Sequence, residues 1–330
     1  MLLSEGLAGV AYRRYRFGQM QTGLRQQLTD AYHATVKQNL VHLHFIKRLE
    51  KKLADSPVAV MVTKGGALLD QAYPQVGMRP MEDIDLIVRP AHHQQLVERL
   101  AEMGFRQNPL RPYSFVNNQM RLDIHSHVLN TDRIASRSSL LPDGMSPFWE
   151  KAVPWDGGYR RVLKPDDADH ILILCQHLLK HYFCRLIWIE DLRRLLDGRN
   201  DRFLRRLYSR AVELGQVRPL AYCLYLLRNL IGFSLPQTTA LQERCPRLGA
   251  SERFLLRLAL IDQHMELLAP MLTAFCIGEF RQRLVYFYEA LFLSTEVLAV
   301  ESGPRRRGRL QGRSFSRILR AGLLFWRHLR

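Results

Sequence analysis

Two aspartates stand one residue apart in the apolar run Asp83-Ile84-Asp85-Leu86-Ile87-Val88, and this run constrains the chain more than any other feature. Its β-branched and aliphatic residues predict a strand, although Asp itself disfavours strands. Because side chains alternate across a strand, both carboxylates point to one side, and Ile84 and Leu86 point into a core. Two carboxylates this close repel each other unless a cation lies between them. The run therefore predicts a metal site on a strand face, in preference to a plain solvated surface.

Two further predicted strands accompany this run. Residues 58–63 form a short apolar stretch rich in β-branched residues, which is typical of a buried strand. Lys64-Gly65-Gly66 follows it and leads into a short helix over 67–73. The alternating stretch 120–128 is the third strand and carries Asp123. We expect Asp123 to complete the ligand set begun by Asp83 and Asp85.

Oxygen ligands of this kind suit a hard divalent cation such as Mg²⁺. Two such ions support in-line phosphoryl transfer, one by activating an attacking hydroxyl and the other by neutralising a departing pyrophosphate. Gly65-Gly66 would let the backbone approach a triphosphate, and Lys64 and Arg79 would neutralise its charge. The plain alternatives are a strand-to-helix turn for the glycines and solvated charges for the two basic residues.

The order of these motifs resembles the bacterial nucleotidyltransferase-like family of the DNA polymerase beta superfamily. The resemblance covers about residues 40–200 and lies in a series of short motifs. They are Lys64-Gly65-Gly66, Tyr73-Pro74, Arg79-Pro80 followed by Asp83-Ile84-Asp85, Gly104-Phe105, Asp123-Ile124-His125, His177 with His181, and Trp188 to Leu192.

The resemblance implies an α+β fold, with a small mixed sheet and flanking helices followed by a mainly helical domain. It implies transfer of a nucleoside monophosphate from an NTP, with Mg²⁺ or Mn²⁺ held by Asp83, Asp85 and Asp123 as catalytic residues. Its nucleotide-binding residues would be Lys64, Gly65, Gly66, Arg79 and His125. The acceptor is not implied, and RNA, a protein hydroxyl, a sugar or a small molecule all stay open.

Four histidines have weaker assignments. His125 and His127 share a strand face with Asp123, and they either contact nucleotide or are ordinary surface residues; only His125 fits the family pattern. His177 and His181 are one helical turn apart, a spacing that can bind metal, but no third ligand accompanies them. Their spacing therefore favours a role in helix packing or hydrogen bonding.

The pattern along the chain predicts five segments. They are an N-terminal helical segment over 1–55, a nucleotidyltransferase core over 56–130, a linker or extended excursion over 131–165, a helical domain over 166–303 and a basic amphipathic tail over 304–330.

The net charge of +17 favours a polyanionic partner such as nucleic acid, nucleotide phosphate or an anionic membrane. The tail over 304–330 would bind anionic lipid or nucleic acid, or else dock on its own fold. Five cysteines without a CxxC pair predict neither a disulfide framework nor a zinc knuckle. No signal peptide or membrane span is expected, which favours the cytoplasm, with a peripheral position at the inner membrane surface left open by the tail.

The leading hypothesis is thus a metal-dependent nucleotidyltransferase that releases pyrophosphate. One alternative is a catalytically silent protein of the same fold that binds nucleotide or nucleic acid. Another, which depends on the tail alone, is a peripheral membrane component serving cell-envelope polysaccharide assembly. The sequence leaves nucleotide preference and oligomeric state open.

Overall fold

A computed structural model describes residues 2–15, 22–129, 131, 134–235, 241, 244–261 and 268–291. The chain forms two compact units. The first comprises Met1–Val128, Met145–Leu174 and Arg185–Arg199, and the second comprises Leu129–Gly144, Cys175–Cys184 and the chain from Asn200 onward. The predicted tail over 304–330 lies outside the described residues.

The first unit is built on a seven-stranded mixed sheet of order β3-β4-β5-β2-β1-β7-β6. Its strands are β1 (Val60–Thr63), β2 (Asp83–Val88), β3 (Arg106–Asn108), β4 (Arg111–Val116), β5 (Arg121–His125), β6 (Val153–Pro154) and β7 (Val162–Lys164). β2 pairs with β5 in parallel, as β1 does with β7, and the other neighbours are antiparallel. The α+β prediction is confirmed by this sheet, its flanking helices and the helical region that follows.

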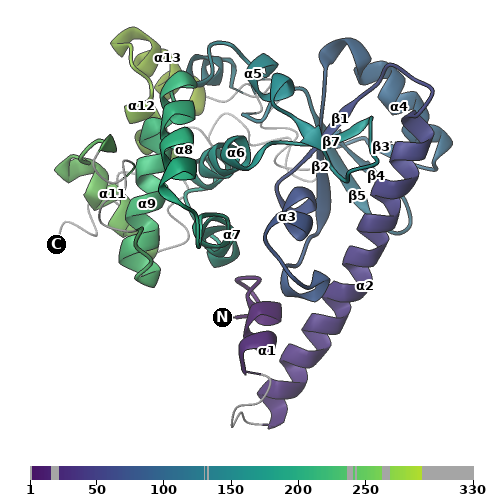
Figure 1. The fold of residues 1–330 in the computed structure, drawn as a ribbon. Helices are drawn as coiled ribbons and strands as arrows, with labels where there is room; N and C mark the ends of the chain where they lie inside the picture. Colours follow the sequence, from purple (N-terminus) through teal and green to yellow (C-terminus); the bar gives the residue numbers. More distant parts are fainter. Residues whose placement is uncertain are drawn as a thin grey trace, which may run out of the picture. The chain divides into compact units, whose positions relative to one another are not determined.

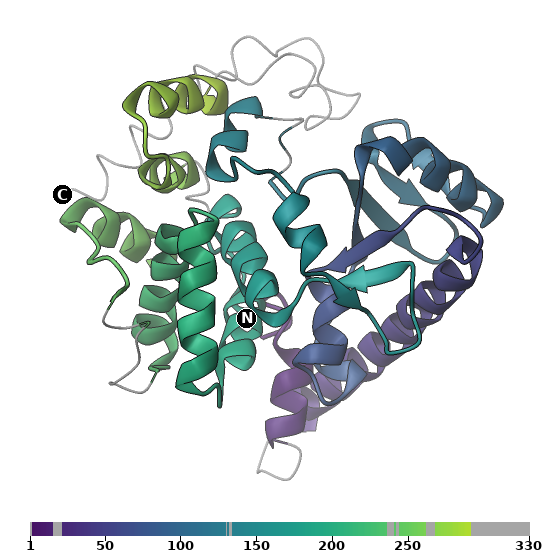
Figure 2. The same ribbon diagram turned by 45° about the horizontal axis from the view of Figure 1, so that its top comes forward.

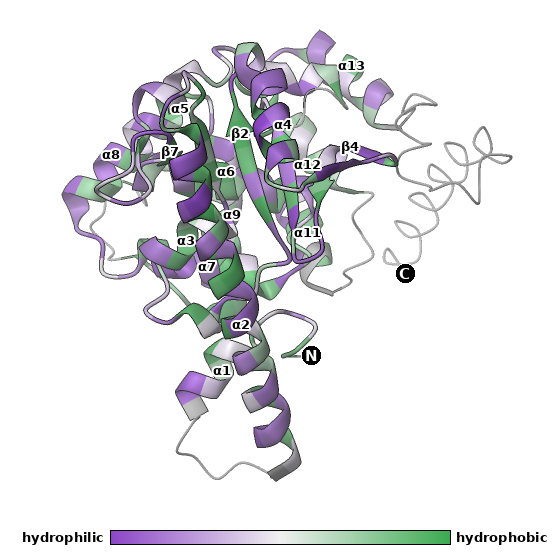
Figure 3. Cartoon of the chain, turned by 90° about the vertical axis from the view of Figure 1, so that its right-hand side faces the viewer, coloured by the Kyte–Doolittle hydropathy of each residue, from purple (hydrophilic) through white to green (hydrophobic). Residues whose placement is uncertain are grey.

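Two helices, α2 (Thr22–Leu53) and α4 (His93–Glu102), cover one face of this sheet with their apolar side chains. Figures 1 and 2 both show α2 running alongside the strands. Ile84 and Leu86 of β2 are fully buried in the resulting core, as the alternation along the strand predicts. Figure 3 shows β2 coloured as hydrophobic over much of its length. The polar residues of the same strand must therefore lie on the opposite face.

The remaining helices of this unit are shorter. They are α1 (Ala8–Tyr15), α3 (Gly65–Gln71), η1 (Val76–Met78), η2 (Pro90–His92), α5 (Ser146–Glu150), the first part of α6 (Asp167–Lys180), and α7 (Leu186–Leu196). Helix α4 ends as its sequence indicates, because Gly104 has a φ of +87° that other residues rarely adopt. The stretch 131–165, which the sequence predicts to be a linker or an extended excursion, contains α5, β6 and β7, and β7 adds a parallel strand beside β1.

The described part of the second unit contains helices and no strands. Its elements are η3 (Ala135–Leu140), the last part of α6, α8 (Asp201–Glu213), α9 (Val217–Ile231), α11 (Ala250–Ile261), α12 (Ala269–Cys276) and α13 (Phe280–Leu291).

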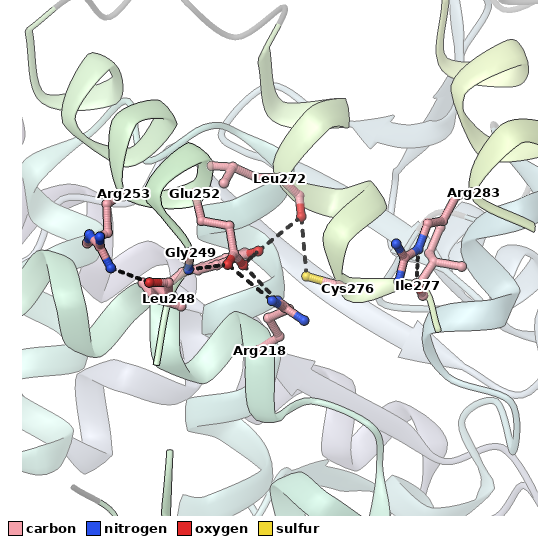
Figure 4. A network of polar contacts seen from close by, with 10 residues as sticks. Arg218, Leu248, Gly249, Glu252, Arg253, Leu272, Cys276, Ile277 and Arg283 are labelled. Carbon is pink, nitrogen blue, oxygen red and sulfur yellow. Dashed lines mark hydrogen bonds and ion pairs between the residues drawn. The ribbon is translucent and has the colours of Figure 1, made fainter. Parts of the chain in front are cut away.

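A buried carboxylate, Glu252 of α11, joins several elements of the second unit (Figure 4). Glu252 accepts hydrogen bonds from the Arg218 Nε at 2.7 Å, from the Tyr222 hydroxyl at 2.6 Å and from the Gly249 amide at 2.7 Å. The carboxylate is therefore paired and hydrogen-bonded inside the unit, as a buried carboxylate must be.

None of the five cysteines, all within the described residues, forms a disulfide. Burial raises the pKa of the Cys245 thiol to about 11 and that of Cys276 to about 12, so both are protonated and unreactive at neutral pH. Among the helices that the structure describes, none combines the length and apolarity needed to cross a membrane.

Candidate active site

Three adjacent strands place the three aspartates on one sheet face. Asp85 of β2 lies directly opposite Asp123 of β5, and it also lies opposite Thr63 of β1 on its other side. Directly opposite residues of paired strands point to the same face, as do residues two apart on one strand. Asp83, two residues before Asp85, therefore shares this face. The structure thus brings together two carboxylates from one strand and a third from a strand far along the chain.

Two basic side chains stand among these carboxylates. The Lys64 Nζ lies 2.5 Å from the Asp85 Oδ1, and the Arg121 Nη2 donates to the Asp83 Oδ2. The Arg121 Nε is 3.9 Å from the Asp123 Oδ1, which is too far for a hydrogen bond. The side chains of Asp83, Asp85 and Asp123 keep exposed fractions of 27%, 12% and 19%. The cluster is therefore half-buried and still reaches solvent.

The third carboxylate is the least satisfied of the three. Burial, together with the charges of Asp83 and Asp85, raises the pKa of Asp123 to about 6. Its buried Oδ1 has no hydrogen-bond partner. A carboxylate with a raised pKa and an unpaired oxygen, beside two others, is a group that a cation would stabilise.

The donor chemistry of this cluster fits a hard divalent cation. Within the described part of the chain, however, no three His, Cys, Asp or Glu side chains are arranged as a metal-ion site. The ammonium of Lys64 pairs with Asp85 and the guanidinium of Arg121 pairs with Asp83. The carboxylates that would hold Mg²⁺ or Mn²⁺ are Asp83, Asp85 and Asp123, and the unpaired Oδ1 of Asp123 supports that fit.

The turn between β1 and α3 is strained at Lys64. Its φ of +51° and ψ of −129° are unusual for a residue with a side chain. Strain of this kind persists where the surroundings over-determine the backbone, and it is concentrated at functional sites. Here the strained residue is the one whose ammonium contacts Asp85.

Both glycines of this turn are buried, and packing alone requires them to lack a side chain. A Cβ on Gly65 would meet the Arg79 guanidinium, and a Cβ on Gly66 would lie 2.5 Å from the Val62 Cγ1. The strand-to-helix turn is therefore one reason for the Gly-Gly pair, and contact of its backbone with phosphate stays a prediction.

We expect Gly66→Ala to lower the free energy of unfolding by about 1–3 kcal/mol, because the new methyl group overpacks against buried Val62. Urea denaturation would measure the change. Gly158→Ala is the matched control, since a Cβ there meets nothing within 4 Å. Equal stability of Gly66→Ala and the wild type would contradict this packing.

Arg79 forms a buried ion pair inside the first unit. Its guanidinium donates to Asp191 of α7 through Nη2 at 2.9 Å and Nε at 3.3 Å, and to the Pro80 carbonyl oxygen at 3.1 Å. The Tyr73 hydroxyl donates to the same carboxylate at 2.6 Å. Arg79 and Asp191 are both buried. The sequence assigned Arg79 to phosphate, but the structure gives it an internal ion pair, so the nucleotide site proposed below omits it.

This ion pair also accounts for three of the sequence motifs. Tyr73, Arg79 and Asp191 come from the Tyr-Pro, Arg-Pro and Trp188–Leu192 motifs, and they meet in one buried cluster. Arg194 covers the Tyr73 ring at 4.7 Å. The spacing of these motifs along the chain thus serves the packing of α7 against the turns around β2.

The histidines differ in position. His125 lies on β5 two residues after Asp123, is buried, and stacks on Tyr113 with ring centroids 5.3 Å apart. Contact of His125 with nucleotide stays a prediction. His177 and His181 lie in the second unit with their rings 4.7 Å apart, consistent with packing.

Arg121 was missed by the sequence interpretation. The signal was present, because Arg121 stands two residues before Asp123 on an alternating strand and so shares its face. Thr63 was missed as well, although its buried hydroxyl lies opposite Asp85 and has no hydrogen-bond partner.

A family model described as an uncharacterised nucleotidyltransferase matches residues 3–232. The chain belongs to this family. The match includes every strand of the sheet and all three aspartates. No curated protein and no solved structure matches the chain.

Proposed function

We propose that this protein transfers a nucleoside monophosphate from an NTP to a hydroxyl acceptor and releases pyrophosphate. The observation that carries the proposal is the convergence of Asp83, Asp85 and Asp123 on one solvent-accessible sheet face in a member of a nucleotidyltransferase family. Mg²⁺ or Mn²⁺, when bound, would lower the pKa of the attacking hydroxyl and neutralise the leaving pyrophosphate.

The chain's own residues would divide the work. Asp83 and Asp85 would hold the cations from one strand, and Asp123 would hold them from the neighbouring strand. Asp123, with its pKa of about 6, is also poised to accept the proton of the acceptor hydroxyl. Lys64 would exchange its contact with Asp85 for a phosphate oxygen, and the rigid sheet would orient the three carboxylates.

The test is transfer of label from NTPs carrying a labelled α-phosphate. Each NTP is incubated with the protein and with separate RNA, protein, sugar and small-molecule fractions of a cell extract. We expect labelling of one fraction, release of one pyrophosphate per transfer, and loss of both when EDTA removes the divalent cation. Asp55→Ala is the matched control, because Asp55 is an exposed carboxylate of the same unit. Undiminished transfer by Asp85→Ala would overturn the proposal.

A second function is favoured by one specific observation. The ion pairs of Lys64 with Asp85 and of Arg121 with Asp83 already neutralise much of the carboxylate charge. A nucleotide-binding protein without catalysis would have the same arrangement. Isothermal titration with Mg²⁺ and each NTP separates the two: tight binding without transfer to any acceptor fraction supports the silent function.

A further inference from the structure

Arg121 lies in the middle of the carboxylate cluster. Its Nη2 donates to Asp83, while its Nε lies 3.9 Å from the Asp123 Oδ1. Its side chain keeps an exposed fraction of 33%. The guanidinium therefore stands between two predicted cation ligands and still reaches solvent.

Two atoms of this arrangement are unsatisfied. The Arg121 Nε and the Asp123 Oδ1 are both buried, and neither has a hydrogen-bond partner. A buried donor and a buried acceptor that face each other without bonding destabilise the fold. A complex of a metal cation with a phosphate group would satisfy both atoms. The cation would bind the carboxylate oxygen, and a phosphate oxygen would accept a hydrogen bond from the N–H group.

The charge balance points the same way. Three carboxylates, Asp83, Asp85 and Asp123, face two cations, Lys64 and Arg121, so the cluster carries one net negative charge (−3 + 2 = −1). Two divalent cations alone would change this to +3, whereas two cations with the four negative charges of an NTP would leave it at −1. The electrostatics therefore oppose metal alone and favour metal together with triphosphate.

We propose that Arg121 is a triphosphate-binding residue that pairs with the metal-binding carboxylates until nucleotide arrives. The inference rests on the proposed function and adds to it a nucleotide-binding residue and a coupling between metal and nucleotide. When cation and NTP bind together, the guanidinium leaves Asp83 for a phosphate oxygen. Only its side chain has to rotate, because its backbone stays in β5 between β2 and β4. The consequence is positive coupling between metal and nucleotide.

An arginine suits this role better than a lysine. The planar guanidinium forms two parallel hydrogen bonds with either a carboxylate or a phosphate, so it can exchange one oxyanion for the other with the same donor geometry. An ordinary structural ion pair predicts no such exchange, because it would stay closed when nucleotide binds.

The experiment is isothermal titration of the full chain with Mn²⁺ alone and with Mn²⁺ plus an α,β-methylene ATP analogue that cannot be hydrolysed. The variants are Arg121→Gln, Arg121→Lys and, as a matched control, Arg106→Gln, which removes an exposed arginine of β3. Circular dichroism establishes that each variant is folded.

We expect Arg121→Gln to raise the affinity for Mn²⁺ in the absence of nucleotide by about tenfold, because the substitution removes one repelling charge a few ångströms from the ion. The same variant should weaken the Mn²⁺–nucleotide complex by about tenfold through loss of a charge-assisted hydrogen bond. The ratio of the two affinities would then change by about 100-fold. Arg121→Lys should leave the affinity for Mn²⁺ without nucleotide unchanged and should lower only the affinity for nucleotide with Mn²⁺. Arg106→Gln should change neither affinity.

Each contrary result has a distinct meaning. If Arg121→Gln raises the affinity for Mn²⁺ but leaves the affinity for nucleotide unchanged, Arg121 is only a structural counter-ion and the inference is overturned. If both affinities stay as in the wild type, the inference is also overturned, while label transfer by the wild type would keep the proposed function. Should the wild type bind neither Mn²⁺ nor nucleotide, both proposals fall. If Arg121→Gln does not fold, the Arg121→Lys result decides.

Discussion

Asp123→Asn should reduce nucleotidyl transfer by at least about 10³-fold and at the same time stabilise the protein without metal. The loss of activity follows from removing a predicted cation ligand and proton acceptor, which is equivalent to about 4 kcal/mol of transition-state stabilisation. The gain in stability follows from the pKa of the carboxyl. Because burial and the charges of Asp83 and Asp85 raise that pKa from 3.8 to about 6, ionised Asp123 destabilises the folded state.

The pH dependence has a defined sign. The unfolded carboxyl loses its proton near pH 3.8 and the folded one near pH 6, so its contribution to stability is fully present below the first value and is lost as pH rises through the second. The difference of about two pKa units has an upper limit of about 3 kcal/mol, and partial exposure reduces it to about 1–2 kcal/mol.

Urea denaturation in EDTA should therefore give Asp123→Asn a higher free energy of unfolding than the wild type at pH 8. The difference should disappear below pH 3.8, where the wild-type carboxyl becomes protonated in both states. Asp55→Asn, at an exposed carboxylate of the same unit, should show no such difference. A variant that loses stability at pH 8 would show that Asp123 is a structural residue, whatever its effect on transfer.

Asp191→Ala should lower the free energy of unfolding by about 3–5 kcal/mol. The substitution leaves the guanidinium of Arg79 buried without its carboxylate, and an uncompensated buried charge is among the most destabilising changes in a protein. It also removes the acceptor of the Tyr73 hydroxyl. The midpoint and slope of urea denaturation, followed by circular dichroism, measure the effect.

A double-mutant cycle identifies the mechanism. Asp191→Ala combined with Arg79→Met removes both charges and should destabilise less than Asp191→Ala alone. Tyr73→Phe should lower stability by only about 1–2 kcal/mol, since it removes one neutral donor. Asp197→Ala at the end of the same helix, where the carboxylate is 61% exposed, should stay within about 1 kcal/mol of the wild type. A full additive loss in the double variant would mean that the two residues act independently.

Local pattern was sufficient for three of the seven strands, β1, β2 and β5, and for their polarity. Strand β2 begins and ends at the residues that the alternation indicates, and β5 lies within the predicted third strand. Alternation has a period of two, so the faces of Asp83, Asp85 and Asp123 follow from the sequence once the strands are known. The same rule would have placed Arg121 beside them.

Interactions across the chain were decided only by tertiary structure. Arg79 stands four residues before Asp83, which made phosphate the natural expectation, but its partner Asp191 is 112 residues away. Strand β7 pairs with β1 across a stretch rich in turn-forming residues, and its three residues carry too little pattern to predict a strand.

The sequence by itself determined which residues share a face, because alternation along a strand and the order of the motifs are local properties of the chain. Only the tertiary structure decided which charges meet. An ion pair depends on the distance between side chains that the fold brings together, and that distance decided that Arg79 pairs with Asp191 while Arg121 and Lys64 lie among the carboxylates.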